Sequence, residues 1–214
     1  LIGSLIALKV KMTSIPEMVA LFNGFGGLAT FFIAWSEFNA IPDNVFQYVL
    51  IMLTTYIGGV TFSGSIIAYG KLSEKLKIQK DSIITKLFTT LFYLSILFLV
   101  YSTALTSFIE IPIDFYKVLL ILTLLGGIGF VLPIGGGDMP VVISLLNSFS
   151  GIAAAFAGLL LLNNVLIVAG SLVGASGLIL TVIMAKAMNR SIGNILFVGY
   201  ASTSKSSASQ ETGE

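Results

Sequence analysis

The sequence predicts an all-α membrane protein, a bundle of about six transmembrane helices. The first reason is composition, because 56% of the 214 residues are hydrophobic and 10% are charged, whereas about a quarter of a soluble domain is charged. The second is arrangement, since the apolar residues form long uncharged runs of about the 20 residues that cross a hydrocarbon core. Length alone would allow one or two soluble domains, but these runs favour helices that cross a bilayer.

The composition also excludes several kinds of chemistry. The net charge is +1, so the sequence has no excess of basic residues that would indicate a nucleic-acid partner. The sequence has no cysteine, which excludes disulfides, thiolate chemistry and iron–sulfur ligation. It has no histidine, the commonest metal ligand and the side chain best suited to proton transfer near neutral pH. We therefore expect no metal site in this chain.

The uncharged runs set the order of the spans. We expect residues 1–8 to be the tail of a truncated transmembrane helix, because the chain opens on Leu1 and shows no signal peptide. Residues 201–214 are polar and rich in Ser and Thr, which predicts a flexible linker. Residues 9–200 form the membrane domain, with spans expected at residues 16–36, 44–70, 87–109, 116–134, 139–162 and 164–185.

The last two spans are expected to be separate helices. No charged residue lies between Met139 and Ala185, and one helix of that length would be roughly 70 Å long, more than twice the hydrocarbon core. Asn163 and Asn164 are the predicted turn, with one Asn closing a helix and the next capping another.

Several polar or small residues have a structural interpretation. Ser14 and Glu17 match the capping box, which favours a cap over a catalytic acid for Glu17. Asn23 lies among glycines, so we expect a close helix contact with Asn23 hydrogen-bonded across it. The small residues of Gly58–Ser65 favour helix packing, with a polar conduit lining as the other interpretation. Residues 87–109 are rich in Phe and Leu and predict a lipid-facing helix.

The stretch Gly135–Gly151 carries the strongest functional signal. Asp138 is the only charged residue between Lys117 and Lys186, and an acid at membrane depth is costly and indicates function. The alternative is that Asp138 only caps the N-terminus of the helix that follows, with Pro in its first turn. The predicted helix carries four polar side chains, those of Ser144, Asn147, Ser148 and Ser150.

The basic residues orient the bundle. If the segment Lys9–Ser14 is cytoplasmic, every Lys and Arg except Lys117 lies on that side, as the positive-inside rule requires. Asp138 then lies at the cytoplasmic mouth, with Asn147 about 13 Å deeper along the same helix. Asn23 lies at a similar depth on its own helix, so we expect the two amides to share a polar interior.

Several motifs, in order along the chain, resemble one family. The most distinctive are Ile134–Ser150, Gly170–Gly177 (GSLVGASG) and Lys186–Ser191 (KAMNRS). Pro16–Ala20 (PEMVA) and Thr61–Ser65 (TFSGS) fit the same pattern. Together they resemble the membrane domain of the proton-translocating NAD(P) transhydrogenase β subunit. They cover nearly the whole chain, so the set is specific although each motif alone is weak.

The resemblance implies the membrane proton-channel domain of an enzyme that passes hydride from NADH to NADP⁺ while protons move inward. NADP(H) and NAD(H) then serve the complete enzyme, and this chain alone lacks the hydride-transfer sites and binds neither nucleotide. The implied partners are an α subunit with an NAD-binding domain and further transmembrane helices, the chain's own C-terminal NADP-binding domain, a second copy in a homodimer of the complex, and lipid. The implied location is multi-pass in a bacterial inner membrane, with the mitochondrial inner membrane as the alternative.

The resemblance also assigns roles to residues of this sequence. It places four polar residues in the proton path: Asp138, Asn147, Asn23 and Ser144. It places three residues at the hinge that couples the membrane helices to the NADP-binding domain: Lys186, Arg190 and Ser191. It assigns helix packing in the final span to Gly170, Gly174 and Gly177.

One position departs from the family. Many relatives carry a histidine in the proton path where this sequence has Asn23, and an amide does not titrate at ordinary pH. Either water carries the proton past Asn23 or a partner subunit supplies the titrating group, and we favour the partner subunit. The glycine runs do not follow a strand, so they are not dinucleotide fingerprints.

Two other classes of protein fit parts of the pattern. One is half of a secondary ion or substrate transporter, in which Asp138 and broken glycine-rich helices bind the substrate; weak inverted repeats would favour it, and none is evident. The other is a membrane anchor that conducts nothing, in which Asp138 and Glu17 are helix caps.

Overall fold

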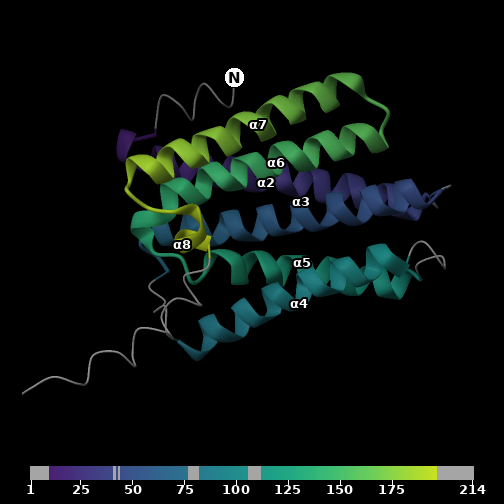
Figure 1. Ribbon diagram of the computed structural model, residues 1–214, viewed down its shortest axis with the longest axis horizontal. Coiled ribbons are helices and arrows are strands. Elements are labelled where there is room, and N and C mark those ends of the chain that lie inside the picture. Colours follow the sequence, from purple (N-terminus) through teal and green to yellow (C-terminus); the bar gives the residue numbers. More distant parts are fainter. Residues whose placement is uncertain (1–9, 41, 43, 77–81, 106–111, 197–214) are drawn as a thin grey trace, which may run out of the picture.

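The computed structural model describes residues 10–40, 42, 44–76, 82–105 and 112–196, and these form helices with no strand among them (Figure 1). Each of six long helices is long and apolar enough to cross a membrane, which confirms the predicted fold class. They are α2 (Ile15–Asn39), α3 (Val45–Leu72), α4 (Ile83–Leu105), α5 (Ile113–Val131), α6 (Met139–Leu160) and α7 (Asn164–Ala187). The shorter ones are η1 (Met12–Ser14), η2 (Gly136–Asp138) and α8 (Ile192–Leu196). The predictions for 1–8 and 201–214 lie outside the described residues.

Helix α3 is the centre of the bundle. It packs against α2, α5 and α6, and it is the most buried of the six long helices. Its small residues allow this, since a Cβ added to Gly58 would lie 2.8 Å from the carbonyl oxygen of Gly27 on α2. Without a hydrophobic drive between helices in lipid, close backbone packing of small residues stabilises the contact. Gly58–Ser65 is therefore helix-packing surface, as the simpler interpretation predicted.

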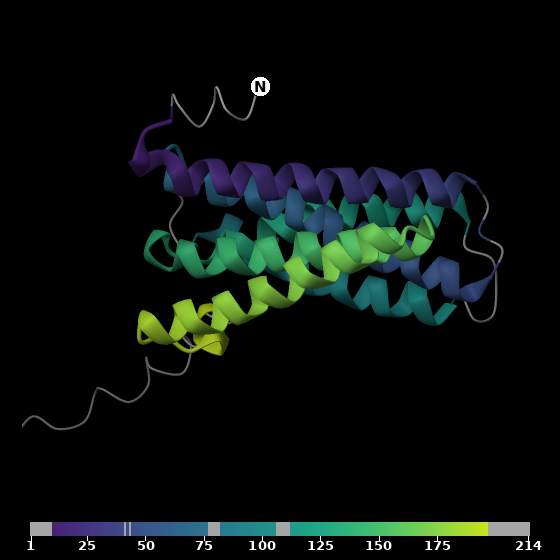
Figure 2. The ribbon, with the colours of Figure 1, turned by 90° about the horizontal axis from the view of Figure 1, so that it is seen from above.

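Helices α4 and α7 lie on opposite sides of the bundle (Figure 1). Each packs mainly on one neighbour, α4 on α5 and α7 on α6, and both are largely exposed. Figure 2 shows α7 on the outside of α6, away from α2. Exposed leucines such as Leu87, Leu94 and Leu97 cover α4, which agrees with the lipid-facing helix that its Phe- and Leu-rich sequence predicted.

The span boundaries differ from the prediction by a few residues. Helix α5 begins at Ile113 instead of residue 116, because Pro112 is extended and precedes the first turn. Asp114 and Lys117 then form an ion pair of 3.0 Å along that turn. The helix ends at Val131, two residues before Pro133, since proline has no N–H with which to continue the helical hydrogen bonds.

Two predicted caps require correction. The capping box of Ser14 and Glu17 does not form, because Ser14 closes η1 with φ −95° and ψ 3° and its side chain makes no cap hydrogen bond. A capping residue normally has extended backbone. In the turn between α6 and α7, the cap of α7 is Asn163 and not the predicted Asn164, which is the first residue of the helix. The Asn163 side chain accepts from the N–H of Leu166 at 3.1 Å, and Leu162, with φ 51°, occupies the left-handed position after α6 that was predicted for Asn163.

Candidate functional site

Asp138 lies at the junction of η2 and α6, at the end of the bundle where α7 ends and α8 begins (Figure 1). It is buried, with 7% of its surface exposed. It occupies the N-cap position of α6, yet its side chain makes no cap hydrogen bond and its backbone is helical, with φ −92° and ψ −1°. Capping therefore does not explain this acid, because a cap needs extended backbone that aims the side chain at the first turn.

The carboxylate of Asp138 pairs with Arg190 instead. Its Oδ1 lies 3.5 Å from Nε of Arg190, in the segment between α7 and α8. The Arg190 side chain is 59% exposed, so the pair contributes about 1 kcal/mol or less to stability. The value of the contact is positional: it joins a buried acid on α6 to the segment that follows the last long helix.

Asn23 joins α2 to α6. Its side chain is buried and its Nδ2 donates to the carbonyl oxygen of Ile143 at 3.3 Å, which is the predicted hydrogen bond across a helix contact. Ile143 is four residues before Asn147, about one helical turn. The structure therefore brings Asn23 to the turn of α6 that ends at Asn147. The Asn147 amide is half-buried.

Ser144 and Ser148 face the outer helix α7. The Ser144 hydroxyl donates to the carbonyl of Gly177 at 3.2 Å, and that of Ser148 donates to the carbonyl of Gly174 at 2.7 Å. Both hydroxyls thus bond α6 to α7. The resemblance implied a role in the proton path for Ser144. In the structure its hydroxyl bonds to the neighbouring helix α7.

The three glycines of α7 lie against α6. A Cβ added to Gly177 would lie 2.8 Å from Cα of Ser148, and one added to Gly174 would lie 3.0 Å from Cγ1 of Ile152. One added to Gly170 would overlap the backbone of Ala155. Side chains at these positions would push the two helices apart, so the geometry agrees with the packing role that the resemblance implies.

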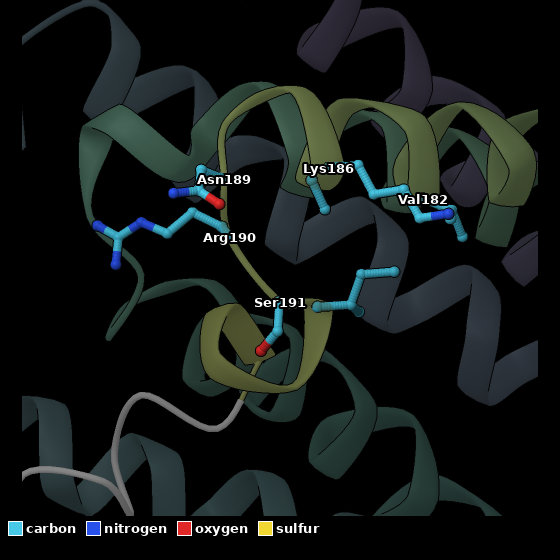
Figure 3. Close-up of a pocket in the computed structure, with 7 residues that line it drawn as sticks. Val182, Lys186, Asn189, Arg190 and Ser191 are labelled. Atoms are coloured by element: carbon cyan, nitrogen blue, oxygen red, sulfur yellow. The ribbon is translucent and has the colours of Figure 1, made fainter.

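The end of α7 forms an open pocket of about 490 Å³. It is lined by Val182, Ala185, Lys186, Asn189, Arg190, Ser191 and Ile192. Asn189 adopts φ 53° and the N–H of Arg190 bonds to the carbonyl of Ala185 at 2.9 Å, which is how a left-handed residue closes a helix. In Figure 3 the side chains of Lys186 and Arg190 point in opposite directions from this turn. The pocket therefore does not gather the two cations around one ligand.

Two residues of this region were not singled out by the sequence. The hydroxyl of Ser65 on α3 is buried and has no hydrogen-bond partner among the described residues, although buried hydroxyls usually have one. It lies beside α2, since a Cβ added to Gly24 would lie 3.1 Å from the Ser65 Cβ. Lys71 is the other. It lies in the last turn of α3 and bonds to the end of α5.

In the part of the chain that the structure describes, no three His, Cys, Asp or Glu side chains lie together as metal ligands would. The fold and the site thus define a multi-pass α-helical membrane domain with a buried acid, a polar contact between helices and a charged connection at one end. The chain belongs to the NAD(P) transhydrogenase beta subunit family, whose pattern matches residues 1–214. This confirms the resemblance carried by the ordered motifs.

Curated relatives support the same assignment. The chain is 39% identical over 215 residues to the NAD(P) transhydrogenase subunit beta of Rhodospirillum rubrum, an alignment that covers 94% of this chain and 45% of the relative. The corresponding protein of a named strain of the same species gives the same identity and coverage. The chain therefore spans about half the length of these relatives.

Proposed function

We propose that this chain is the proton-translocating membrane part of an NAD(P) transhydrogenase. In the complete enzyme, hydride would pass from NADH to NADP⁺, giving NAD⁺ and NADPH, while protons move inward across the membrane. The observation that carries the proposal is the contact between Asp138 and Arg190, 3.5 Å apart. It connects a buried acid inside the bundle to the segment that follows the last long helix.

Each polar residue has a place in this proposal. Asp138 takes up or releases the proton at the cytoplasmic mouth, because it is a buried acid at the end of the bundle that carries Lys11, Lys71 and Lys186. Deeper in the bundle, Asn23 and Asn147 line the proton path between α2 and α6 or bind the water that forms it. Ser144 stands beside this path on the α7 side. Neither amide titrates, so the titrating group at this depth is supplied by a partner subunit.

The hinge follows from the same connection. Lys186, Arg190 and Ser191 lie where α7 ends and α8 begins, and the Ser191 hydroxyl accepts from the N–H of Asn194 at 3.1 Å. A change in the attached NADP-binding domain would move this segment, and with it Arg190 relative to Asp138. Gly170, Gly174 and Gly177 keep α7 against α6 so that the movement reaches the bundle.

The proposal includes partners and cofactors of the complete enzyme. An α subunit would bring the NAD-binding domain and further transmembrane helices, and a C-terminal domain of this subunit would bind NADP(H). That the relatives are more than twice as long as the aligned region supports a further domain. The complex would form a homodimer in a lipid membrane, with a bacterial inner membrane as our first choice.

The test is Asp138→Asn in the complete enzyme reconstituted in vesicles. We expect the proton uptake that accompanies hydride transfer from NADH to NADP⁺ to be lost. An amide keeps the size of the side chain, but it neither ionises nor transfers a proton. The matched control is Asp114→Asn, which removes an exposed acid from the opposite end of the bundle and should pump normally. Proton pumping at the normal rate in Asp138→Asn would refute the assigned role.

A further inference from the structure

The carboxyl-terminal end of α5 is buried and needs hydrogen-bond donors. The last carbonyls of any helix lack intrahelical partners, and here Val131, Leu132 and Ile134 are at most 2% exposed. Pro133 makes the shortage worse because it has no N–H to donate. The Val131 carbonyl accepts from the N–H of Ile134 at 3.1 Å. Backbone carbonyls buried without a partner are rare because each costs the free energy of a lost hydrogen bond, so we expect the carbonyls of Leu132 and Ile134 to be satisfied from another element.

Lys71, in the last turn of α3, supplies those donors. Its ammonium donates to the carbonyls of Val131 at 3.3 Å and Ile134 at 2.6 Å, and also to that of Leu132. An ammonium has three N–H donors, enough for contacts with all three carbonyls. Bonds from a charged donor are stronger than neutral ones, and the positive charge lies at the negative end of the α5 dipole.

The segment fixed by Lys71 leads directly to Asp138. Ile134 is followed by Gly135, η2 and then α6. A Cβ added to Gly136 or to Gly137 would have no heavy atom within 4 Å, so no packing at these two residues sets where η2 lies. Its place is therefore set by the residues on either side of the two glycines: Ile134, held by Lys71, and the buried Asp138 and Met139 at the start of α6.

We propose that Lys71 is a positioning residue for Asp138, holding the 134–138 segment so that the carboxylate stays buried beside Arg190. The functional half of this inference depends on the proposed role of Asp138, whereas the structural half does not. The sequence offers a matched comparison in Lys75. It lies four residues further along the chain, is exposed, and has its Nζ 5.6 Å from the ring centre of Tyr69.

The experiment uses the complete enzyme with a spin label on Gly136→Cys. The 214 residues contain no cysteine, so only cysteines elsewhere in the complete enzyme need replacement. The label is compared in the parent, in Lys71→Met and in Lys75→Met by electron paramagnetic resonance. We expect Lys71→Met to make the label clearly more mobile and Lys75→Met to leave it unchanged. A second label on Asn164→Cys, at the opposite end of the bundle, should not respond to either.

Proton pumping is then measured in the same variants without the label. We expect Lys71→Met to slow pumping about tenfold to a hundredfold, the usual scale for loss of a positioning contact, and Lys75→Met to pump normally. Thermal melting of each variant separates this from loss of folded protein. If Lys71→Met does not accumulate, Lys71→Gln carries the same readouts, because it is neutral but keeps two N–H donors.

The outcomes distinguish the two proposals. An unchanged label at position 136 in Lys71→Met overturns the positioning role, whatever the pumping rate. A mobile label with normal pumping in both Lys71→Met and Asp138→Asn leaves the structural half standing and overturns the proposed function. A mobile label with normal pumping in Lys71→Met but none in Asp138→Asn overturns the functional half of this inference alone.

Discussion

The closest approach of α2 to α3 predicts a large difference between two adjacent glycines. A Cβ on Gly27 would lie 2.7 Å from the carbonyl oxygen of Gly58 and 2.9 Å from the backbone nitrogen of Phe62. Both are backbone atoms, so they cannot turn away as a side chain could. A Cβ on Gly26 would have Ser150 Cβ as its nearest neighbour, at 3.7 Å, an ordinary contact.

The magnitude follows from two opposing terms. Replacing Gly with Ala inside a helix favours folding by about 0.5–1 kcal/mol, and this gain is common to both positions. Overpacking a tight contact costs about 1–3 kcal/mol, and only Gly27→Ala incurs it. The difference in unfolding free energy between the two variants therefore isolates the steric cost, with Gly27→Ala less stable by about 1–3 kcal/mol.

The assay is reversible unfolding of the purified protein in mixed micelles, with helicity followed against the mole fraction of denaturing detergent. The parent, Gly26→Ala and Gly27→Ala are measured side by side, and midpoints are compared at equal slope. We expect Gly26→Ala to equal or exceed the parent. Equal stability of the two alanine variants would show that α2 and α3 do not meet at this distance, and the packing argument for α3 as the central helix would fail.

Two further predictions concern the outer helix α7. Ser148→Ala removes a hydrogen bond of 2.7 Å to the Gly174 carbonyl and should lower the unfolding free energy by about 1 kcal/mol. The control is Ser150→Ala, which should lower it less because the Ser150 hydroxyl bonds to Asn147 within its own helix. A larger loss in Ser150→Ala than in Ser148→Ala would contradict the contact between α6 and α7. Asn163→Ala removes the cap of α7 and should lower the unfolding free energy by about 1 kcal/mol, measured in the same assay. Asn164→Ala should lower it less, because Asn164 is already inside the helix. Equal losses in the two variants would mean that the cap does not stabilise α7.

The long helices could be predicted because each is specified locally. A run of uncharged apolar residues crosses the hydrocarbon whatever its neighbours are, so the number and order of spans follow from the sequence. Even the contact at Asn23 had a local signal, an amide among glycines. The failed capping box of Ser14 shows the limit, since a short 3-10 turn before α2 changed the backbone that the cap needed.

The partners of Asp138 and Lys71 could not be predicted in the same way. Arg190 follows Asp138 by a complete helical hairpin, and the carbonyls bound by Lys71 lie about sixty residues further along the chain. These contacts depend on which helix ends meet at one end of the bundle. The composition of the spans does not encode that meeting, so the sequence could mark Asp138 as unusual but could not name what holds it.

Two tyrosines that bond between helices also bear on how a proton would cross this bundle. The hydroxyl of Tyr116 shares a hydrogen bond of 2.7 Å with Thr55, and that of Tyr56 shares one of 3.1 Å with Ser95. Both join α3 to its outer neighbours α5 and α4, whereas the polar contact of Asn23 lies on the other side, between α2 and α6. The tyrosines therefore do not extend the path from Asp138 past Asn147. A proton that follows the α2–α6 contact needs water or an acid from outside this chain, which is why the proposed function includes the partner subunit.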